Sequence, residues 1–206
     1  DLHFKVWPAA LPRHLSLPET SVFYNLKVSA RRYPRRAAIV FYETSISYAR
    51  LHAEALALAG YLQGRCQVSH GDRVMLFMQN SPQFIAGYYA VLRADAAVVP
   101  VNPMNRTDEL RHYCVDSGAT VAMVAQELFD QVAPLLAEGL LKQVIVVTYS
   151  DYLEAETELR VPDVIRAPRQ TASGSGVIAW VDALAAAGPL AESMVGPDDL
   201  CVMPYT

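Results

Sequence analysis

Three side chains of metal-binding type lie close together in the sequence: His112, Cys114 and Asp116. The helical period expected there places His112 and Asp116 on one face and turns Cys114 away from them. Coordination by all three is therefore geometrically poor, because a metal needs converging ligands. We interpret them as helix surface or partly buried residues. His52, on another expected helix, has no acid or nucleophile at a catalytic spacing and is interpreted likewise.

The spacing of Gly174, Gly176 and Ala179 satisfies the pattern GxGxxA. A dinucleotide-binding fingerprint follows a strand directly, because its glycines form the turn between strand and helix. Here residues 167–171 (APRQT) precede the glycines, so we interpret this stretch as a flexible linker. The patterns GxSxG, HExxH and GxxxxGK[ST] do not occur, which leaves serine hydrolases, zinc proteases and Walker-type ATPases without support. Spacing alone does not reveal an active site.

The cysteine pattern and the N-terminus indicate an oxidation state and a compartment. Cys66, Cys114 and Cys201 are far apart and form no CxxC pair, which predicts reduced thiols in a cytoplasmic protein. Residues 1–8 lack the apolar run of a signal peptide. The uncharged stretch 74–92 is interrupted by Gln, Asn, Ser and Pro, which favours a strand, a turn and a helix over a membrane span.

The apolar pattern alternates between short strands and amphipathic helices. Strands are predicted at 37–42, 74–79, 97–101, 120–125, 144–149 and 200–205, and helices at 21–32, 47–63, 81–94, from 107, at 126–137 and at 181–187. The strands are continuous apolar runs, as a sheet covered on both faces requires. Their alternation with helices predicts an α/β fold, a mostly parallel sheet flanked by helices. With 52% hydrophobic residues, the chain has ample material for a core.

Charge is unevenly distributed along the chain. Residues 1–70 hold nine Lys or Arg against four Asp or Glu, a net charge of +5, and the remainder holds eight against seventeen, a net charge of −9. The basic excess centres on Arg31, Arg32, Arg35 and Arg36. No interleaved aromatics or groove-entering motif accompany this cluster, so no nucleic-acid partner is predicted. We interpret it as a solvated helix end, with a partner or acidic-lipid surface as the alternative.

Several ordered sequence blocks resemble one enzyme family. Gly71-Asp72-Arg73-Val74 precedes an expected strand, and LRADAAVVPVNP (92–103) resembles the family pattern L-[KR]-A-G-A-x-x-x-P-[VL]-[ND]-P, with Asp95 in place of the usual Gly. SYARL (47–51) resembles [TS]-Y-x-[ED]-L, with Arg50 in place of the acid. The blocks resemble the N-terminal region of adenylate-forming enzymes, which comprise acyl-CoA synthetases, luciferases and peptide-synthetase adenylation domains. The Asn-Pro ending and PETSVFYNL (18–26) are most similar to bacterial long-chain fatty acid-CoA ligases.

The tail DDLCVMPYT (198–206) resembles the strand that leads into the family's phosphate loop. By this resemblance, Tyr205 and Thr206 are the nucleotide-binding candidates, and Thr206 is also the candidate to hold magnesium. No catalytic residue is assigned. The adenine motif, the ribose-binding acid and the catalytic lysine of relatives lie further downstream than this chain reaches. We therefore expect an N-terminal fragment that is inactive alone.

The resemblance implies a function for the intact protein. It would activate a long- or medium-chain fatty acid with ATP and Mg²⁺ through an acyl-adenylate and transfer the acyl group to coenzyme A. Alternatives are an aryl-acid ligase, a luciferase-like enzyme, a peptide-synthetase adenylation domain or a non-catalytic α/β binding module. A homodimer contact and a peripheral contact with the inner membrane face are further candidate interactions, for which the arginine cluster and the Pro-rich arm are the proposed surfaces.

The sequence predicts that the chain has four parts. Residues 1–20 are expected to form an extended arm, and 21–149 the α/β subdomain. Residues 150–176 lack a periodic apolar face and are expected to be a long loop or insertion. Residues 177–206 are expected to supply a helix and the strand that leads into the incomplete phosphate loop.

Overall fold

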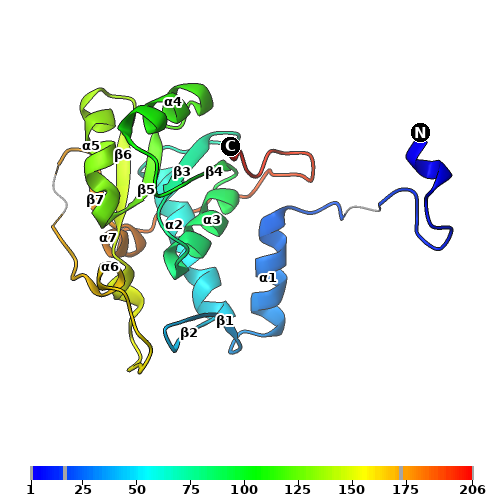
Figure 1. The fold of residues 1–206 in the computed structure, drawn as a ribbon, viewed down its shortest axis with the longest axis horizontal. Coiled ribbons are helices and arrows are strands. Elements are labelled where there is room, and N and C mark those ends of the chain that lie inside the picture. The colour runs from blue at the N-terminus through cyan, green and yellow to red at the C-terminus, as the bar shows by residue number, and fades with distance from the viewer. Residues whose placement is uncertain (1, 16–17, 172–173, 206) are drawn as a thin grey trace.

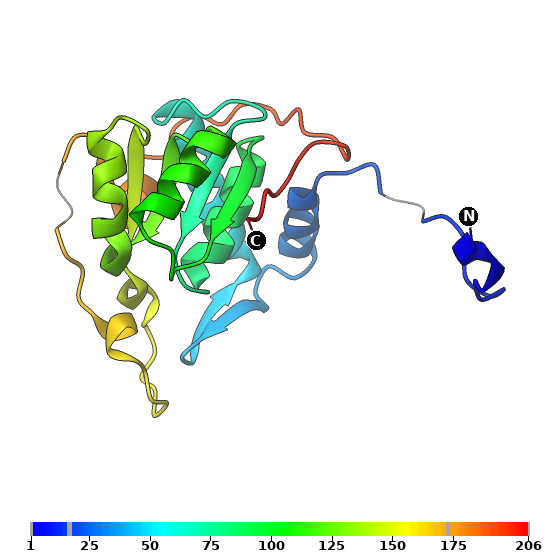
Figure 2. The same ribbon diagram turned by 45° about the horizontal axis from the view of Figure 1, so that its top comes forward.

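The computed structural model describes residues 2–15, 18–171 and 174–205. The described chain forms three layers, in which a parallel sheet lies between two layers of helices (Figure 1). The fold class predicted from the sequence is therefore confirmed. Residues 2–15 project away from this body (Figures 1 and 2), and they contain a short 3-10 helix, Leu2–Lys5, within the arm that was expected to be extended.

The main sheet has five strands. They are β3 (Arg73–Phe77), β4 (Ala97–Val101), β5 (Val121–Ala125), β6 (Gln143–Val147) and β7 (Val177–Ala179). Their order is β4-β3-β5-β6-β7, and every pair is parallel. Strand β5 is buried along its whole length, as a strand covered on both faces must be. Strand β7 was not predicted, because its three residues are too few to show a pattern.

Two helical layers cover the sheet (Figure 2). One layer consists of α2 (Tyr48–Gly64), α3 (Pro82–Arg93) and α7 (Trp180–Ala185), with α1 (Val22–Arg32) packed against α2 and α3. The other consists of α4 (Thr107–Ser117) and α5 (Phe129–Ala137). Successive residues of β3 alternate between the two cores, with Leu76 facing the first layer and Met75 the second.

Serine side chains begin the two central helices as the sequence predicted. The Ser47 hydroxyl accepts the backbone N–H of Arg50 at 3.2 Å, and the Ser81 hydroxyl accepts that of Phe84 at 3.2 Å. Pro82 occupies the first position of α3, where a missing N–H costs nothing. These caps satisfy donors that the first helical turn leaves free.

A hairpin lies apart from the main sheet. Strands β1 (Ala37–Phe41) and β2 (Thr44–Ser47) pair antiparallel, and the second of them was not assigned from the sequence. The two linking residues, Tyr42 and Glu43, have φ of 44° and 67°. Positive φ at both positions is what a two-residue type I′ turn requires.

Asp95 occupies the position where the family pattern carries glycine. Its φ is 64°, in the left-handed region that glycine adopts without cost. The aspartate is 5% exposed, and its carboxylate accepts the hydroxyl of Ser193 at 2.5 Å and the backbone N–H of Met194 at 2.9 Å. The substitution is therefore more than a helix-end variation, because it attaches the 190s segment to the end of α3.

The segment 150–176 is more structured than a simple loop. It contains the end of a 3-10 helix, Tyr149–Tyr152, and the short α6 (Asp163–Arg166). The backbone N–H groups of Glu154 and Ala155 donate to the Thr44 hydroxyl at 2.9 and 3.0 Å. Gly176 accepts the Val144 N–H at 2.7 Å, so this glycine belongs to the sheet edge and its interpretation as part of a flexible linker was wrong. Residues 172–173 lie outside the described residues.

Arg50 connects this segment to α2. Its guanidinium donates two hydrogen bonds to Glu154, each 2.8 Å long, and one to Glu54, also 2.8 Å. It also lies 5.1 Å from the centre of the Tyr152 ring, whose hydroxyl donates to Glu54 at 2.8 Å and accepts the N–H of Trp180 at 3.1 Å. Side chains from α2, the 150–176 segment and α7 thereby form one network.

Candidate functional site

The C-terminal residues run along the free edge of β4. The Val98 N–H donates to the Cys201 carbonyl at 3.0 Å, and the Met203 N–H donates to the Val98 carbonyl at 2.8 Å. Val98 and Val202 form a single parallel bridge, so the predicted strand 200–205 is a contact of one residue pair rather than a full strand. The chain leaves the sheet after Met203, and the tail that leads toward the expected phosphate loop lies at this edge (Figure 1).

Tyr205 lies against α4. Its ring stacks on Tyr113 with centroids 4.3 Å apart, and its hydroxyl donates to the Asp116 carboxylate at 2.6 Å. Desolvation and this carboxylate raise the pKa of Tyr205 to about 12, so the phenol stays protonated. The hydroxyl is thus already used within the chain. Thr206, the other predicted nucleotide-binding residue and the predicted magnesium ligand, lies outside the described residues.

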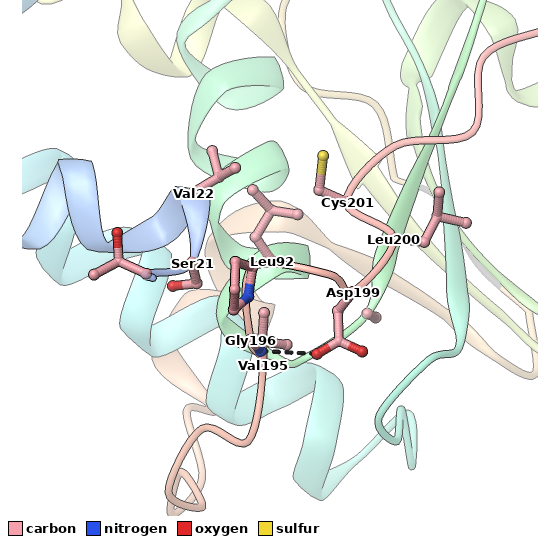
Figure 3. Close-up of a pocket in the computed structure, with 11 residues that line it drawn as sticks. Ser21, Val22, Leu92, Val195, Gly196, Asp199, Leu200 and Cys201 are labelled. Carbon is pink, nitrogen blue, oxygen red and sulfur yellow. Dashed lines mark hydrogen bonds between the residues drawn. The ribbon is translucent and has the colours of Figure 1, made fainter. Parts of the chain in front are cut away.

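A small pocket lies beneath the 195–201 segment (Figure 3). Its volume is about 80 Å³, and α1, α3 and this segment line it. Asp199 closes one side by accepting the Gly196 N–H at 2.8 Å, and its carboxylate lies 3.2 Å from His70. Ligand pockets commonly measure 300 Å³ or more, to about 1,000 Å³, so this one is too small for a nucleotide.

A polar cluster lies at the carboxyl ends of the central strands. The strand order reverses between β3 and β5, because successive strands are added on one side of β3 and then on the other, and open α/β sheets commonly bind ligands at such a point. Gln79 follows β3, Gln126 follows β5 and Thr148 follows β6. The backbone N–H of Gln79 donates to the Tyr149 hydroxyl at 2.8 Å, and the Thr148 hydroxyl donates to the side-chain oxygen Oε1 of Gln126 at 2.9 Å. Hydrogen bonds within the chain therefore already use the Gln79 N–H, the Thr148 hydroxyl and the Gln126 side-chain oxygen at this position.

This cluster was not predicted, although a signal existed. Gln79 and Thr148 lie at the ends of the predicted strands 74–79 and 144–149, and Gln126 directly follows the predicted strand 120–125, which is the pattern of a sheet edge with a polar end. Gln83 completes the cluster: its amide donates to the Thr148 carbonyl at 2.8 Å, while its side-chain oxygen is buried with no hydrogen-bond partner in the described chain. A hollow of about 430 Å³ borders the cluster, and burial raises the pKa of Glu127 on its wall.

His112, Cys114 and Asp116 do not converge on a common point in the described chain. Cys114 is buried in the α4 core, while His112 and Asp116 are exposed, and no group of three metal-binding side chains occurs among residues 2–15, 18–171 and 174–205. His52 stacks on Phe23 with centroids 5.7 Å apart. All three cysteines are free thiols, and burial raises the pKa of Cys114 to about 11 and that of Cys66 to about 12.

The arginine cluster is fully solvated. Residues 31–36 are all exposed at the C-terminal end of α1, and Arg36 lies 5.3 Å from the ring centre of Tyr33. Among the described residues, no helix combines the length and apolar character needed to cross a membrane.

The chain is a three-layer α/β protein with an open parallel sheet. The strands of this sheet have a 2-1-3-4-5 type order, and the C-terminal tail lies on the β4 edge. Residues 26–206 match the family model of the AMP-binding enzymes, and the chain belongs to this family. The family resemblance that the sequence blocks indicated is therefore confirmed.

Curated relatives include long-chain-fatty-acid–CoA ligases. The protein of that name from Bacillus subtilis is 31% identical over 157 residues, which cover 76% of this chain and 28% of the relative. The one from Yersinia pestis is 29% identical over 167 residues, which cover 79% and 30%. The chain thus spans less than a third of the length of these relatives.

Solved structures confirm the fold. A long-chain-fatty-acid-CoA ligase from Archaeoglobus fulgidus superposes with a TM-score of 0.71 at 23% identity, covering 93% of this chain and 35% of that one. An anthranilate CoA ligase in complex with anthranoyl-AMP superposes with a TM-score of 0.75 at 16% identity, covering 92% and 33%. At these identities the likeness concerns the fold alone.

Proposed function

We propose that this chain is the N-terminal part of a fatty acid–CoA ligase, an acid–thiol ligase that forms an acyl-adenylate. The observation that carries the proposal is the 31% identity over 157 residues to a long-chain-fatty-acid–CoA ligase, within a chain that belongs to the AMP-binding enzymes. The body formed by these residues supplies the scaffold and part of the wall around the substrates.

The proposed reaction overcomes the poor reactivity of a carboxylate. A fatty-acid carboxylate oxygen attacks the α-phosphorus of ATP, the bond to the β-phosphate oxygen breaks, and pyrophosphate leaves. The thiolate of coenzyme A then attacks the acyl carbonyl carbon. The bond from this carbon to the bridging oxygen breaks, and AMP leaves with that former carboxylate oxygen on its phosphorus. Positioning of the reactants and neutralisation of phosphate charge supply most of the rate enhancement of such transfers.

Tyr205 and Thr206 remain the proposed nucleotide-binding residues, and Thr206 the proposed magnesium ligand. With the Tyr205 hydroxyl bonded to Asp116 at 2.6 Å, phosphate contacts at this residue would come from its backbone. The stacking of Tyr205 on Tyr113 would then orient the start of the phosphate loop. Backbone N–H groups that converge in such a loop bind phosphate oxygens. Mg²⁺ would neutralise phosphate charge, and coenzyme A would be the acceptor.

The four-part division of the chain also remains a proposal: an arm at 1–20, a subdomain at 21–149, an insertion at 150–176 and a connecting part at 177–206. The 206 residues alone are proposed to be inactive, because they span less than a third of the relatives and contain no assigned catalytic residue. Their location is proposed to be cytoplasmic.

The arginine cluster at residues 31–36 is proposed to contact a second protomer or an anionic membrane surface, because six consecutive exposed residues include four permanent cations. Replacement of Arg31, Arg32, Arg35 and Arg36 by glutamate in the complete protein should reduce self-association or liposome binding. Analytical ultracentrifugation and vesicle co-sedimentation measure these effects, and unchanged values in both would refute the contact.

A substrate panel tests the proposed function. The complete gene product, given ATP, Mg²⁺ and coenzyme A, should form acyl-CoA from fatty acids, with chromatography and mass spectrometry as the readout. Aryl acids and amino acids are the comparison substrates, since the structural likeness includes an anthranilate CoA ligase and a 99-residue match of 37% identity joins the chain to triostin synthetase I of Streptomyces triostinicus. Preference for either comparison class would replace the fatty-acid proposal.

A further inference from the structure

A second hollow lies on the opposite side of the molecule from α4 and α5, between α1, α2 and the 190s segment. Its volume is about 380 Å³, within the range of small-molecule sites. Its lining consists of Ser21, Phe23, Tyr24, Lys27, His52, Leu56, Arg93, Glu192 and Ser193. Ser21, labelled in Figure 3, also lines the pocket of about 80 Å³ described above, so that pocket and this hollow adjoin at the start of α1.

Three nitrogen-bearing side chains from three different helices line this hollow. Lys27 is exposed on α1, His52 is half-buried on α2, and Arg93 is half-buried at the end of α3. Neither Lys27 nor Arg93 forms an ion pair with a carboxylate of the described chain. Two permanent cations that face one hollow without acid partners repel each other, so an anion there would stabilise both.

Arg93 has unused hydrogen-bonding capacity. One terminal nitrogen, Nη2, donates to the Ala191 carbonyl at 2.8 Å, whereas the other, Nη1, is buried with no partner among the described residues. A buried guanidinium nitrogen without an acceptor is costly. In contrast, Arg50 and Arg111 each contact two carboxylates. An anion bound at Arg93 would supply an acceptor for this guanidinium.

His52 lies close enough to both cations to be affected by their charge. Burial and then the nearby Lys27 and Arg93 lower the pKa of its imidazole. The acid in the lining, Glu192, is exposed and forms no ion pair in the described chain. By formal charge, the two cations and the one acid give the lining a net charge of +1.

The hollow also offers uncharged donors. Ser21 precedes α1, and its side chain makes no capping hydrogen bond, so its hydroxyl remains available. The backbone N–H of Tyr24 in the first helical turn already donates to the Ser21 carbonyl at 3.1 Å. An eleven-residue helix presents its positive dipole end there. The stacked pair of Phe23 and His52 and the side chain of Leu56 give the hollow an apolar wall beside these donors.

We propose that this hollow, between α1, α2 and the end of α3, binds a phosphate group through Lys27, Arg93 and Ser21. The phosphate belongs either to a small soluble compound or to a phospholipid headgroup, since both present the same oxygens. Lysine and arginine are the usual side chains for phosphate recognition. The site is separate from the tail at Tyr205, and the proposal does not depend on the ligase function.

The test measures phosphate binding with charge variants of the complete protein. Titration calorimetry with inorganic phosphate at low salt should give saturable binding. Lys27→Glu should weaken it by about tenfold or more, because one cation is lost and one anion gained. Arg160→Glu is the matched control, since it reverses the charge of an exposed residue that does not line the hollow, and it should alter affinity by less than about twofold. Glu192→Gln should strengthen binding.

Nuclear magnetic resonance of the His52 imidazole gives a second readout that does not depend on activity. Bound phosphate should raise the pKa of His52, because the anion stabilises the imidazolium form. Vesicles of phosphatidylcholine with and without phosphatidylglycerol distinguish the two sources of phosphate. Lys27-dependent binding to the anionic vesicles without binding of free phosphate identifies a headgroup and supports the site.

Two results would overturn the proposal. One is the absence of Lys27-dependent binding of both inorganic phosphate and anionic vesicles by protein with an unchanged circular dichroism spectrum. The other is equal weakening by Lys27→Glu and Arg160→Glu, which would show a general effect of surface charge in place of a site.

Discussion

Arg50 shows how one residue that departs from a family pattern acquires partners elsewhere in the chain. The resemblance leads one to expect an acid at this position, and an acid there would face Glu54 on the next helical turn. The arginine instead pairs with Glu54 and reaches Glu154 through two hydrogen bonds. The planar guanidinium suits this task, because it can bind one carboxylate through two parallel bonds.

A charge exchange tests this pairing. Arg50→Glu should destabilise the fold by about 1–2 kcal/mol, since it places an acid beside two others and releases a partly exposed pair. Adding Glu154→Arg should recover part of the loss. Urea unfolding measures the free energies, and limited proteolysis detects release of the 150–176 segment. A double variant no more stable than the single one would contradict the pairing.

The same pair predicts a pH dependence. Its hydrogen bonds to Arg50 hold the pKa of Glu154 below its usual value. As the pH falls, Glu154 therefore takes up a proton in the unfolded chain before it does so in the folded chain. The stability that the pair contributes is fully present above the ordinary glutamate pKa. It is lost as the pH falls through the lowered pKa of Glu154 in the folded chain. The stability difference between the parent and Arg50→Met should shrink between about pH 7 and about pH 3. An unchanged difference would contradict this assignment.

At the scale of elements, the helix caps and buried strands could be predicted because their signals are local. Ser47 and Ser81 act through the next helical turn, and β3 to β6 are continuous apolar runs. The hairpin partner β2 and the edge strand β7 could not be predicted, because their few residues are ordered by pairing with distant segments.

The backbone of α2 lies very close to the segment that follows α7. A Cβ at Gly60 would collide with the backbone carbonyl of Gly188, whereas a Cβ at Gly64 would meet open space. Gly60→Ala should therefore destabilise the fold by about 1–3 kcal/mol. Gly64→Ala is the matched control and should stabilise it by up to about 1 kcal/mol. Thermal unfolding measures both, and equal effects of the two changes would refute the close contact.

For the whole molecule, the family could be identified from ordered sequence blocks, while the tertiary contacts required the structure. Gln79, Gln126 and Thr148 could each be recognised as a polar residue at a strand end. Their cluster forms because parallel strands end at one edge, and the strand order that brings them together required the structure. The unpaired cations Lys27 and Arg93 are 66 positions apart in the sequence, and their common hollow follows from helix packing.

Fatty-acid-dependent exchange of pyrophosphate into ATP tests the proposed fatty acid–CoA ligase function most directly. This exchange reports adenylate formation without requiring coenzyme A. The complete gene product should catalyse it with a fatty acid and Mg²⁺, and the 206-residue chain alone should not. Exchange by the 206-residue chain, or its absence from the complete protein with every fatty acid supplied, would contradict the account.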